Sequence, residues 1–182
     1  MLTAIIYSSQ TGSCERYARE LSRTLHLPCE PLKSCKVRSD GKVIYVGWLM
    51  AGKVYGLSSA ISKLDVAAVV GVGMGPVTAD SAAQGHEANR LPAHVPYFQV
   101  QGGLHLAALK PPMRLAMRLV NKSIAVKLRE KAEKTPLNAQ EQATLRMALT
   151  GDGEPAAWDC EAVIDWARKQ NGFLTKAREL AK

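Results

Sequence analysis

Hydroxyl side chains and a glycine follow the first apolar run of the chain, in the segment Ser9-Gln10-Thr11-Gly12-Ser13-Cys14. Residues 4–7 before it have the composition of a buried strand, and a helical pattern begins at Cys14. Free N–H groups and the positive end of a helix dipole favour an anion at such a junction. The hydroxyls could bind phosphate oxygens, and Gly12 lets the main chain approach closely. The segment predicts either a phosphate site or an ordinary capped turn.

A second candidate segment follows the strand-like residues 43–46 and contains Trp48, Leu49, Met50 and Ala51. The flat face of Trp48 could stack on a planar ring, with Tyr55 as a second aromatic candidate. Alternatively, Trp48 covers the edge of the sheet. Gly47 to Lys53 nearly spells the Gly-x-x-x-x-Gly-Lys loop of nucleotide-binding proteins, but Val54 stands where the metal-binding hydroxyl belongs. We therefore expect no nucleoside triphosphate site here.

A third candidate is the glycine-rich run after the strand-like residues 66–72, with Gly73, Met74 and Gly75 before Pro76. Pro76 replaces the last glycine of the G-x-G-x-x-G fingerprint, so the run does not predict a dinucleotide site. Because its glycines carry no side chain, the main chain of this run could lie against the edge of a flat ring.

The remaining candidates for chemistry are His105 and the four cysteines. His105 follows two glycines and could shuttle a proton, or it is a solvated loop histidine. Cys14, at a helix start, could have a lowered pKa, although a small packing residue also fits there. The cysteines show no C-x-x-C pair and no metal-ligand spacing. We expect no metal site, no signal peptide and a reduced, cytoplasmic protein.

Strand-like runs alternate with helical patterns over about the first hundred residues. The runs lie at residues 4–7, 29–32, 43–46, 66–72 and 95–100, and Asp40-Gly41 predicts a turn before the third. This alternation indicates an α/β domain with a doubly wound, five-stranded parallel sheet between two helical layers. Such sheets bind ligands beyond the carboxyl ends of their strands, so the three candidate segments should meet there.

The positive charge of the chain, +8 in total, is concentrated after the fifth strand-like run. Residues 105–134 hold eight Lys and Arg residues and two Glu residues, a net charge of +6. A helical pattern from Met113 to about Glu133 places on one face Met113, Met117, Val120, Ile124 and Leu128. Arg114, Arg118 and Lys122 lie beside this face. The helix could pack on the sheet domain with its charges in water, or it could contact an anionic membrane surface or an acidic protein.

Nucleic acid is not an expected partner, because aromatic residues are only 5% of the chain and no helix-turn-helix pattern is present.

Two more helices should follow the basic one. Asn138 and Glu141 predict the start of a helix that ends near Gly151. Asp159 is a suitable N-cap for a final helix, whose expected inward-facing residues are Ala162, Val163, Trp166 and Ala167.

The order of elements and the segment Ser9 to Cys14 resemble the flavodoxin-like family. Its phosphate loop has the pattern Ser/Thr-x-Thr-Gly-x-Thr after the first strand, and Cys14 departs from it where Thr or Ser is usual. The resemblance implies FMN, with its phosphate held by amides and hydroxyls. Many flavodoxins place an aromatic residue in the third loop, and none is present here, which would leave one flavin face open.

In architecture the chain is most similar to basic flavodoxin-domain proteins such as menaquinone-dependent protoporphyrinogen dehydrogenases. That resemblance implies an FMN-dependent oxidoreductase that passes electrons or hydride between a small-molecule substrate and an acceptor such as a quinone. We expect one domain over residues 1–182, with a helical insertion at about 105–150, located in the cytoplasm or at the membrane periphery. The alternatives are an electron-transfer flavodoxin that docks an acidic partner and a flavodoxin fold that has lost FMN. The residues assign no catalytic group.

Overall fold

The computed structural model describes residues 1–36 and 41–180; Asp40 of the expected turn lies outside these ranges. The first half contains β1 (Leu2–Ser8), α1 (Ser13–Leu25), β2 (Cys29–Pro31), a 3-10 turn (Leu32–Ser34), β3 (Lys42–Met50), β4 (Lys53–Val54), α2 (Leu57–Ile61) and β5 (Asp65–Gly73). The second half contains α3 (Ser81–Ala88), β6 (Tyr97–Gln101), β7 (Leu104–His105), a 3-10 turn (Leu106–Ala108), α4 (Pro111–Ala132), α5 (Ala139–Thr150), β8 (Asp152–Gly153) and α6 (Glu161–Leu180).

Five parallel strands form the central sheet, in the order β2-β1-β3-β5-β6. The chain moves outward from β1 to β2 and then crosses back to β3, so the direction of winding changes between β1 and β3. This is the strand order of flavodoxin-type sheets. The fold is flavodoxin-like, as the sequence predicted.

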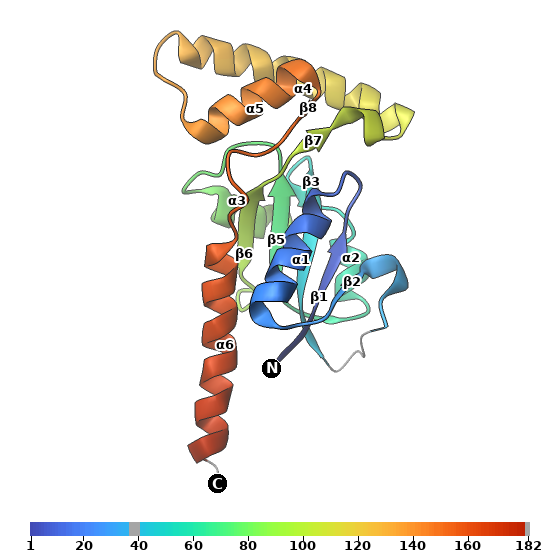
Figure 1. The fold of residues 1–182 in the computed structure, drawn as a ribbon, viewed down its shortest axis with the longest axis vertical. Helices are drawn as coiled ribbons and strands as arrows, with labels where there is room; N and C mark the ends of the chain where they lie inside the picture. The colour runs from blue at the N-terminus through green and yellow to red at the C-terminus, as the bar shows by residue number, and fades with distance from the viewer. Residues whose placement is uncertain (37–40, 181–182) are drawn as a thin grey trace.

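Helices cover both faces of the sheet, with α1 and α6 on one side and α2 and α3 on the other (Figure 1). Alternate residues of β3 divide between the two sides, as strand geometry requires. Ile44 and Val46 lie in the core beneath α1 and α6, whereas Val43 and Tyr45 lie in the second core. The nearly continuous apolar sequence of β5 reflects this burial on both faces.

An insertion of two helices follows the last strand of the sheet. The short antiparallel pair β7–β8 forms its neck, with Leu104 opposite Gly153 and His105 opposite Asp152. Between these strands, α4 and α5 lie across the end of the molecule toward which the sheet strands point (Figure 1). The insertion therefore lies over the carboxyl ends of the strands, where sheets of this kind bind their ligands.

Two helices differ from the expected pattern. The sequence pattern predicts a helix from Thr78 to Leu91, but α3 covers only Ser81–Ala88. The last helix begins at Glu161, so Asp159 lies one position before the N-cap, although its carboxylate accepts the N–H of Glu161 at 3.0 Å. Of its expected inward residues, Val163 and Ala167 are buried and Trp166 is half-buried, but Ala162 is exposed because it lies on the outer side of the first turn.

Candidate functional site

The loop between β1 and α1 has the main-chain geometry of an anion site. Gly12 precedes the helix with φ 97°, in the left-handed region, and no atom lies within 4 Å of the position of a Cβ on this residue. Ser9 Oγ accepts the N–H of Gly12 at 3.1 Å, which closes the loop. No side chain caps α1, so the N–H groups of its first turn have no side-chain acceptor among the described residues. An anion could bind these amides, with the helix dipole adding to the attraction.

The side chains of Ser13 and Cys14 are turned into the protein. Ser13 Oγ accepts the N–H of Gly103 at 3.1 Å and contacts its carbonyl at 3.4 Å. Cys14 is buried in the core, and burial raises the pKa of its thiol to about 12. The Ser13 hydroxyl therefore binds the neck of the insertion, and the Cys14 thiol is a packing group, whereas phosphate binding by the main-chain N–H groups of both residues stays a prediction. The loop side chains left for a ligand are those of Ser9, Gln10 and Thr11.

Cys14 should resist alkylation in the folded protein. With the pKa of the thiol raised to about 12, almost none of it is thiolate at pH 8, and the side chain is also shielded from reagent. We expect iodoacetamide at pH 8 to label half-buried Cys35 at least tenfold faster than Cys14, as measured by peptide mass spectrometry. Equal labelling in urea is the control. Fast labelling of Cys14 in the native protein would contradict its burial.

The second candidate segment is not a loop. Trp48, Leu49 and Met50 continue β3, and the chain then reverses through Ala51 and Gly52 into the antiparallel strand β4. Both turn residues have positive φ, 50° and 79°, which suits the two-residue turn of a tight hairpin. A phosphate-wrapping loop would instead open into a helix, so the hairpin also explains why the resemblance to Gly-x-x-x-x-Gly-Lys carries no function.

An aromatic pair lies on this hairpin, at the carboxyl end of β3. The rings of Trp48 and Tyr55 stack with centroids 4.7 Å apart and planes inclined by 23°. Tyr55 is 48% exposed, whereas Trp48 is half-buried against the core beneath α1. Trp48 Nε1 is buried and has no acceptor among the described residues. Trp48 therefore contributes its ring to this pair, while its N–H is turned into the protein.

The other hairpin residues have different roles. Leu49 packs on the opposite face of the sheet, against the core beneath α2 and α3. Met50 is exposed, and Ala51 forms the turn. Trp48 of this segment therefore lies on the α1 side of the sheet, where Ser8 pairs with Gly47 at the ends of β1 and β3.

The insertion covers one side of the third candidate segment. The carbonyl of Met74 accepts the Thr144 hydroxyl of α5 at 2.9 Å, and Val77 N–H donates to Gln140 Oε1 at 2.8 Å. The Met74 side chain packs with Met147 of α5, so it belongs to the core of the insertion. Gly73 lies against Leu49, whereas nothing lies within 4 Å of a Cβ position on Gly75. Of the three expected ring contacts, only Gly75 faces open space.

Gln101, which belongs to none of the three candidate segments, joins the insertion to the sheet. It is 2% exposed at the last position of β6. Its amide nitrogen donates to the Gln140 carbonyl at 2.9 Å and the Thr144 hydroxyl at 3.0 Å, and contacts the Met74 carbonyl at 3.3 Å. Its amide oxygen accepts the N–H of Ala156 at 3.0 Å. A polar residue ending a buried strand was the signal that could have identified it.

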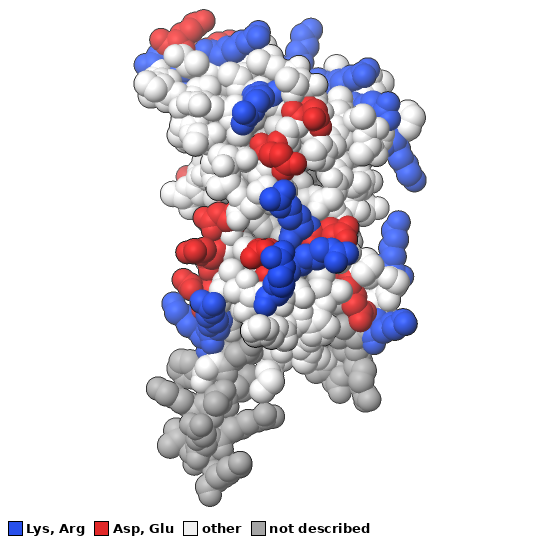
Figure 2. All heavy atoms as spheres, in the orientation of Figure 1, with Lys and Arg blue, Asp and Glu red and all other residues white. Residues whose placement is uncertain are grey.

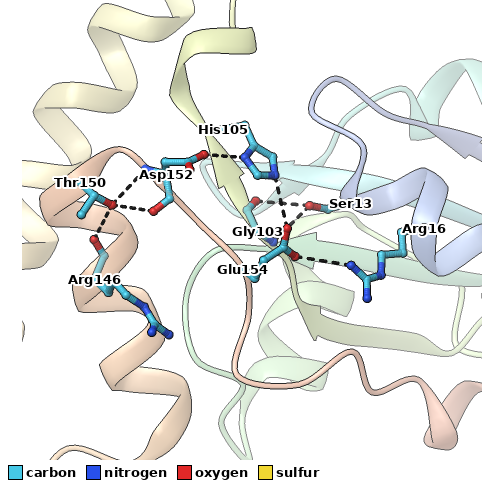
Figure 3. Close-up of polar contacts among 8 residues, drawn as sticks. All are labelled: Ser13, Arg16, Gly103, His105, Arg146, Thr150, Asp152 and Glu154. Atoms are coloured by element: carbon cyan, nitrogen blue, oxygen red, sulfur yellow. Dashed lines mark hydrogen bonds and ion pairs between the residues drawn. The ribbon is translucent and has the colours of Figure 1, made fainter.

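His105 lies between two carboxylates at the neck of the insertion (Figure 3). Its Nδ1 lies 2.6 Å from Asp152 Oδ1, and its Nε2 lies 3.8 Å from Glu154 Oε1. The second oxygen of Glu154 lies 3.7 Å from Arg16, on the first turn of α1. His105 is thus neither free in a loop nor directed at the first-turn amides. These polar contacts connect the neck to α1, the helix that begins the candidate site.

The start of α5 is stabilised by a capping box. Asn138 Oδ1 accepts the N–H of Glu141 at 2.9 Å, and Glu141 Oε2 accepts the N–H of Asn138 at 3.0 Å. Lys131 of α4 also donates to the Glu141 carboxylate. The hydrogen bond from Lys131 is the main reason that the pKa of Glu141 is lowered. These contacts connect the two insertion helices.

A Glu141→Gln variant should lower the free energy of unfolding by about 1 kcal/mol at pH 7, because a charged hydrogen bond to Lys131 is lost. The folded-state pKa of Glu141 is lowered, so its stabilisation is present at neutral pH and is lost as the pH falls through that pKa. The difference between wild type and variant in urea denaturation should therefore shrink in acid. Glu133→Gln, at an exposed glutamate, is the matched control; a difference that persists at pH 3 would contradict the assignment.

Two cavities lie beside Tyr17, and no residue of the three candidate segments lines either of them. One, of about 290 Å³, lies along β6 and includes Gln99, Ser81 and Asp159 in its lining. The other, of about 890 Å³, lies between α1 and α6. The candidate site is instead the open surface at the end of β1, β3 and β5.

No protein-family model matches this chain, and no curated protein matches it. Among solved structures, a flavodoxin from the domain Archaea aligns with 56% of this chain and 85% of its own, at 10% sequence identity and a TM-score of 0.38. The flavodoxin-like fold therefore rests on the strand order of this chain and on the crossing between β1 and β3.

Proposed function

We propose that this protein binds FMN and acts as a flavodoxin-like oxidoreductase, passing electrons or hydride between a substrate and an acceptor such as a quinone. The uncapped start of α1 behind Gly12, at the point where the winding of the sheet reverses, is the observation that carries the proposal. In sheets of this order that point is the ligand site, and helix starts bind phosphate. The resemblance to protoporphyrinogen dehydrogenases narrows the reaction class within this proposal.

The residues present fit a planar ligand with a phosphate. The first-turn amides of α1, with Ser9 and Thr11, would hold the phosphate without a Lys or Arg. Arg19 pairs with Glu15 at 2.6 Å and so offsets the only acidic charge in the first turn. Tyr55, which is 48% exposed, offers an aromatic ring on which a planar ligand could stack. FMN, when bound, supplies the hydride and electron chemistry.

The chain itself would bind, orient and shield the ligand. The helix dipole favours the phosphate charge at the start of α1. The contacts of Met74 and Val77 with α5 hold the third segment in place and exclude water from one side of the site. The opposite side remains open, where a substrate or a redox partner could approach.

Quenching of FMN fluorescence tests the proposal. We expect one FMN to bind per chain, and riboflavin, which lacks the phosphate, to bind at least tenfold more weakly. Equal affinity for the two would contradict phosphate binding at α1. No quenching by micromolar protein would overturn the proposal and favour a flavodoxin fold that has lost its cofactor.

The exposed side chains of Arg118 and Lys122 in the insertion support a second candidate, an electron-transfer protein that docks an acidic partner. Stopped-flow oxidation of the reduced, FMN-loaded protein distinguishes the two. Multiple turnovers with a small substrate and a soluble quinone, without any other protein, would support the enzyme. Electron transfer that requires an acidic protein would support the carrier.

A further inference from the structure

Helix α4 has apolar side chains on two faces, and the described residues of the chain cover only one of them. The inner face contains Asn121 and Ala125, which are buried, and Met113, Met117, Ile124 and Leu128, which are half-buried. Val120, expected on this face, is exposed because it lies at its edge. The outer face contains Leu115, Leu119 and Val126, which are 63%, 67% and 49% exposed. Their spacing of four and seven residues places them in one stripe.

Cations flank this outer stripe. Arg118, Lys122, Lys127 and Arg129 are exposed, and none forms an ion pair within residues 1–36 and 41–180. Figure 2 shows Lys and Arg side chains around white surface at the end of the molecule formed by α4 and α5. Glu130 is the only acidic residue of α4. The surface thus combines aliphatic side chains with charges that lack a counter-ion.

Two of the basic residues have structural roles. Arg114 donates to the carbonyls of Ala107 and Leu109 at 2.8 and 2.9 Å, which fixes the start of α4. Lys131 binds Glu141. Arg114 thus has acceptors within the chain, and its expected role in binding a partner stays a prediction. The basic side chains of α4 that remain available to a partner are those of Arg118, Lys122, Lys127 and Arg129.

We propose that the outer stripe of α4, Leu115, Leu119 and Val126 with its flanking cations, docks on the surface of an anionic lipid bilayer. A helix lying in a bilayer interface buries an apolar stripe while its Lys and Arg side chains reach up to the phosphates. Leu115 to Val126 spans about 16 Å along the helix axis, enough for several lipid headgroups.

The shape and charge of this end of the molecule favour a bilayer over other occupants. α4 runs across the end of the molecule, so a flat surface can reach its outer face (Figure 1). A second copy would bring the same cations together, which costs electrostatic energy. An acidic protein would match the charges but leaves the aliphatic stripe unexplained. Within the described part of the chain, no helix is long and apolar enough to cross a membrane, so the contact is interfacial.

Cosedimentation with lipid vesicles tests the proposal. The full chain should bind vesicles of phosphatidylcholine with 30% phosphatidylglycerol and should not bind phosphatidylcholine alone. Leu115→Ser with Leu119→Ser should lower the binding about tenfold, because two aliphatic side chains no longer enter the interface. Ile61→Ser is the matched control, since Ile61 is 48% exposed on α2, and it should bind like wild type.

A charge pair completes the test. Arg118→Gln with Lys122→Gln should lower the binding about tenfold or more and flatten its salt dependence. Lys63→Gln with Lys169→Gln, at exposed lysines away from α4, should change it much less. Circular dichroism and urea denaturation show whether the variants remain folded, and neither depends on lipid or FMN.

Three results would overturn the proposal. The first is a wild-type chain that fails to bind the anionic vesicles. The second is a Leu115→Ser, Leu119→Ser variant that binds like wild type. Charge by itself would then account for vesicle binding, and an acidic protein would be the favoured partner. The third is an equal loss in the Ile61→Ser control. Because this surface does not include the flavin site, failure to bind FMN would leave the proposal intact.

Discussion

A Gln101→Leu variant should lose about 3 kcal/mol of unfolding free energy, the largest stability effect that we expect for a substitution of similar volume. The buried side chain makes hydrogen bonds to Gln140, Thr144 and Ala156. Leucine cannot replace them, and each buried group left without a partner costs about 1–3 kcal/mol. Urea denaturation followed by circular dichroism measures the loss.

Gln99→Leu is the matched control, because Gln99 lies on the same strand, half-buried, with no hydrogen bond from its side chain among the described contacts. Its effect should stay within about 1 kcal/mol. The Gln101 variant should also be cleaved first within the insertion by a low concentration of protease, because the insertion has lost its attachment to β6. Equal stability of the two variants would mean that Gln101 does not hold the insertion.

A Gly12→Val variant should bind FMN about a hundredfold more weakly than wild type while it remains folded. A β-branched residue is strongly disfavoured at φ 97°, so the loop should relax and turn its amides away. Losing two hydrogen bonds from amides to a charged phosphate costs about 3 kcal/mol, which corresponds to this fold-change. Space is not the cause, since no atom lies within 4 Å of the Cβ position.

Gly151→Val is the matched control for this prediction. Gly151 also has positive φ, 75°, but it caps the end of α5 within the insertion. The control should destabilise the protein and leave FMN affinity within about threefold of wild type. If Gly12→Val binds FMN as tightly as wild type does, the phosphate does not bind at the start of α1. Fluorescence titration of both variants gives the answer.

Patterns of apolar residues predicted the sheet well, because burial constrains them directly. The uninterrupted Val- and Ala-rich run of β5 can only be satisfied by burial on both faces. The capping box at Asn138 and Glu141 was predicted correctly for a similar reason, since it depends on residues three apart in the chain. Local chemistry of this kind leaves few alternatives.

The hairpin after β3 was missed because its turn residues, Ala51 and Gly52, do not include the Asn or Asp that usually marks such a turn. Their positive φ values depend on the pairing of Leu49 with Val54, a contact that periodicity does not reveal. The roles of Ser13 and Met74 were missed for a related reason. Each is decided by a partner about 70 or more residues away, Gly103 for one and Thr144 of the insertion for the other.

By itself, the sequence determined the α/β class, the parallel sheet, the glycine-containing turn before α1 and the location of the excess positive charge. These follow from periodicity, local hydrogen bonding and composition, which act over a few residues. Only the tertiary structure decided which face of α4 is covered and which side chains of the candidate segments are free. Leu119 and Ile124 are both aliphatic, and their exposure differs because α5 packs on one side of α4 and nothing in the described chain packs on the other.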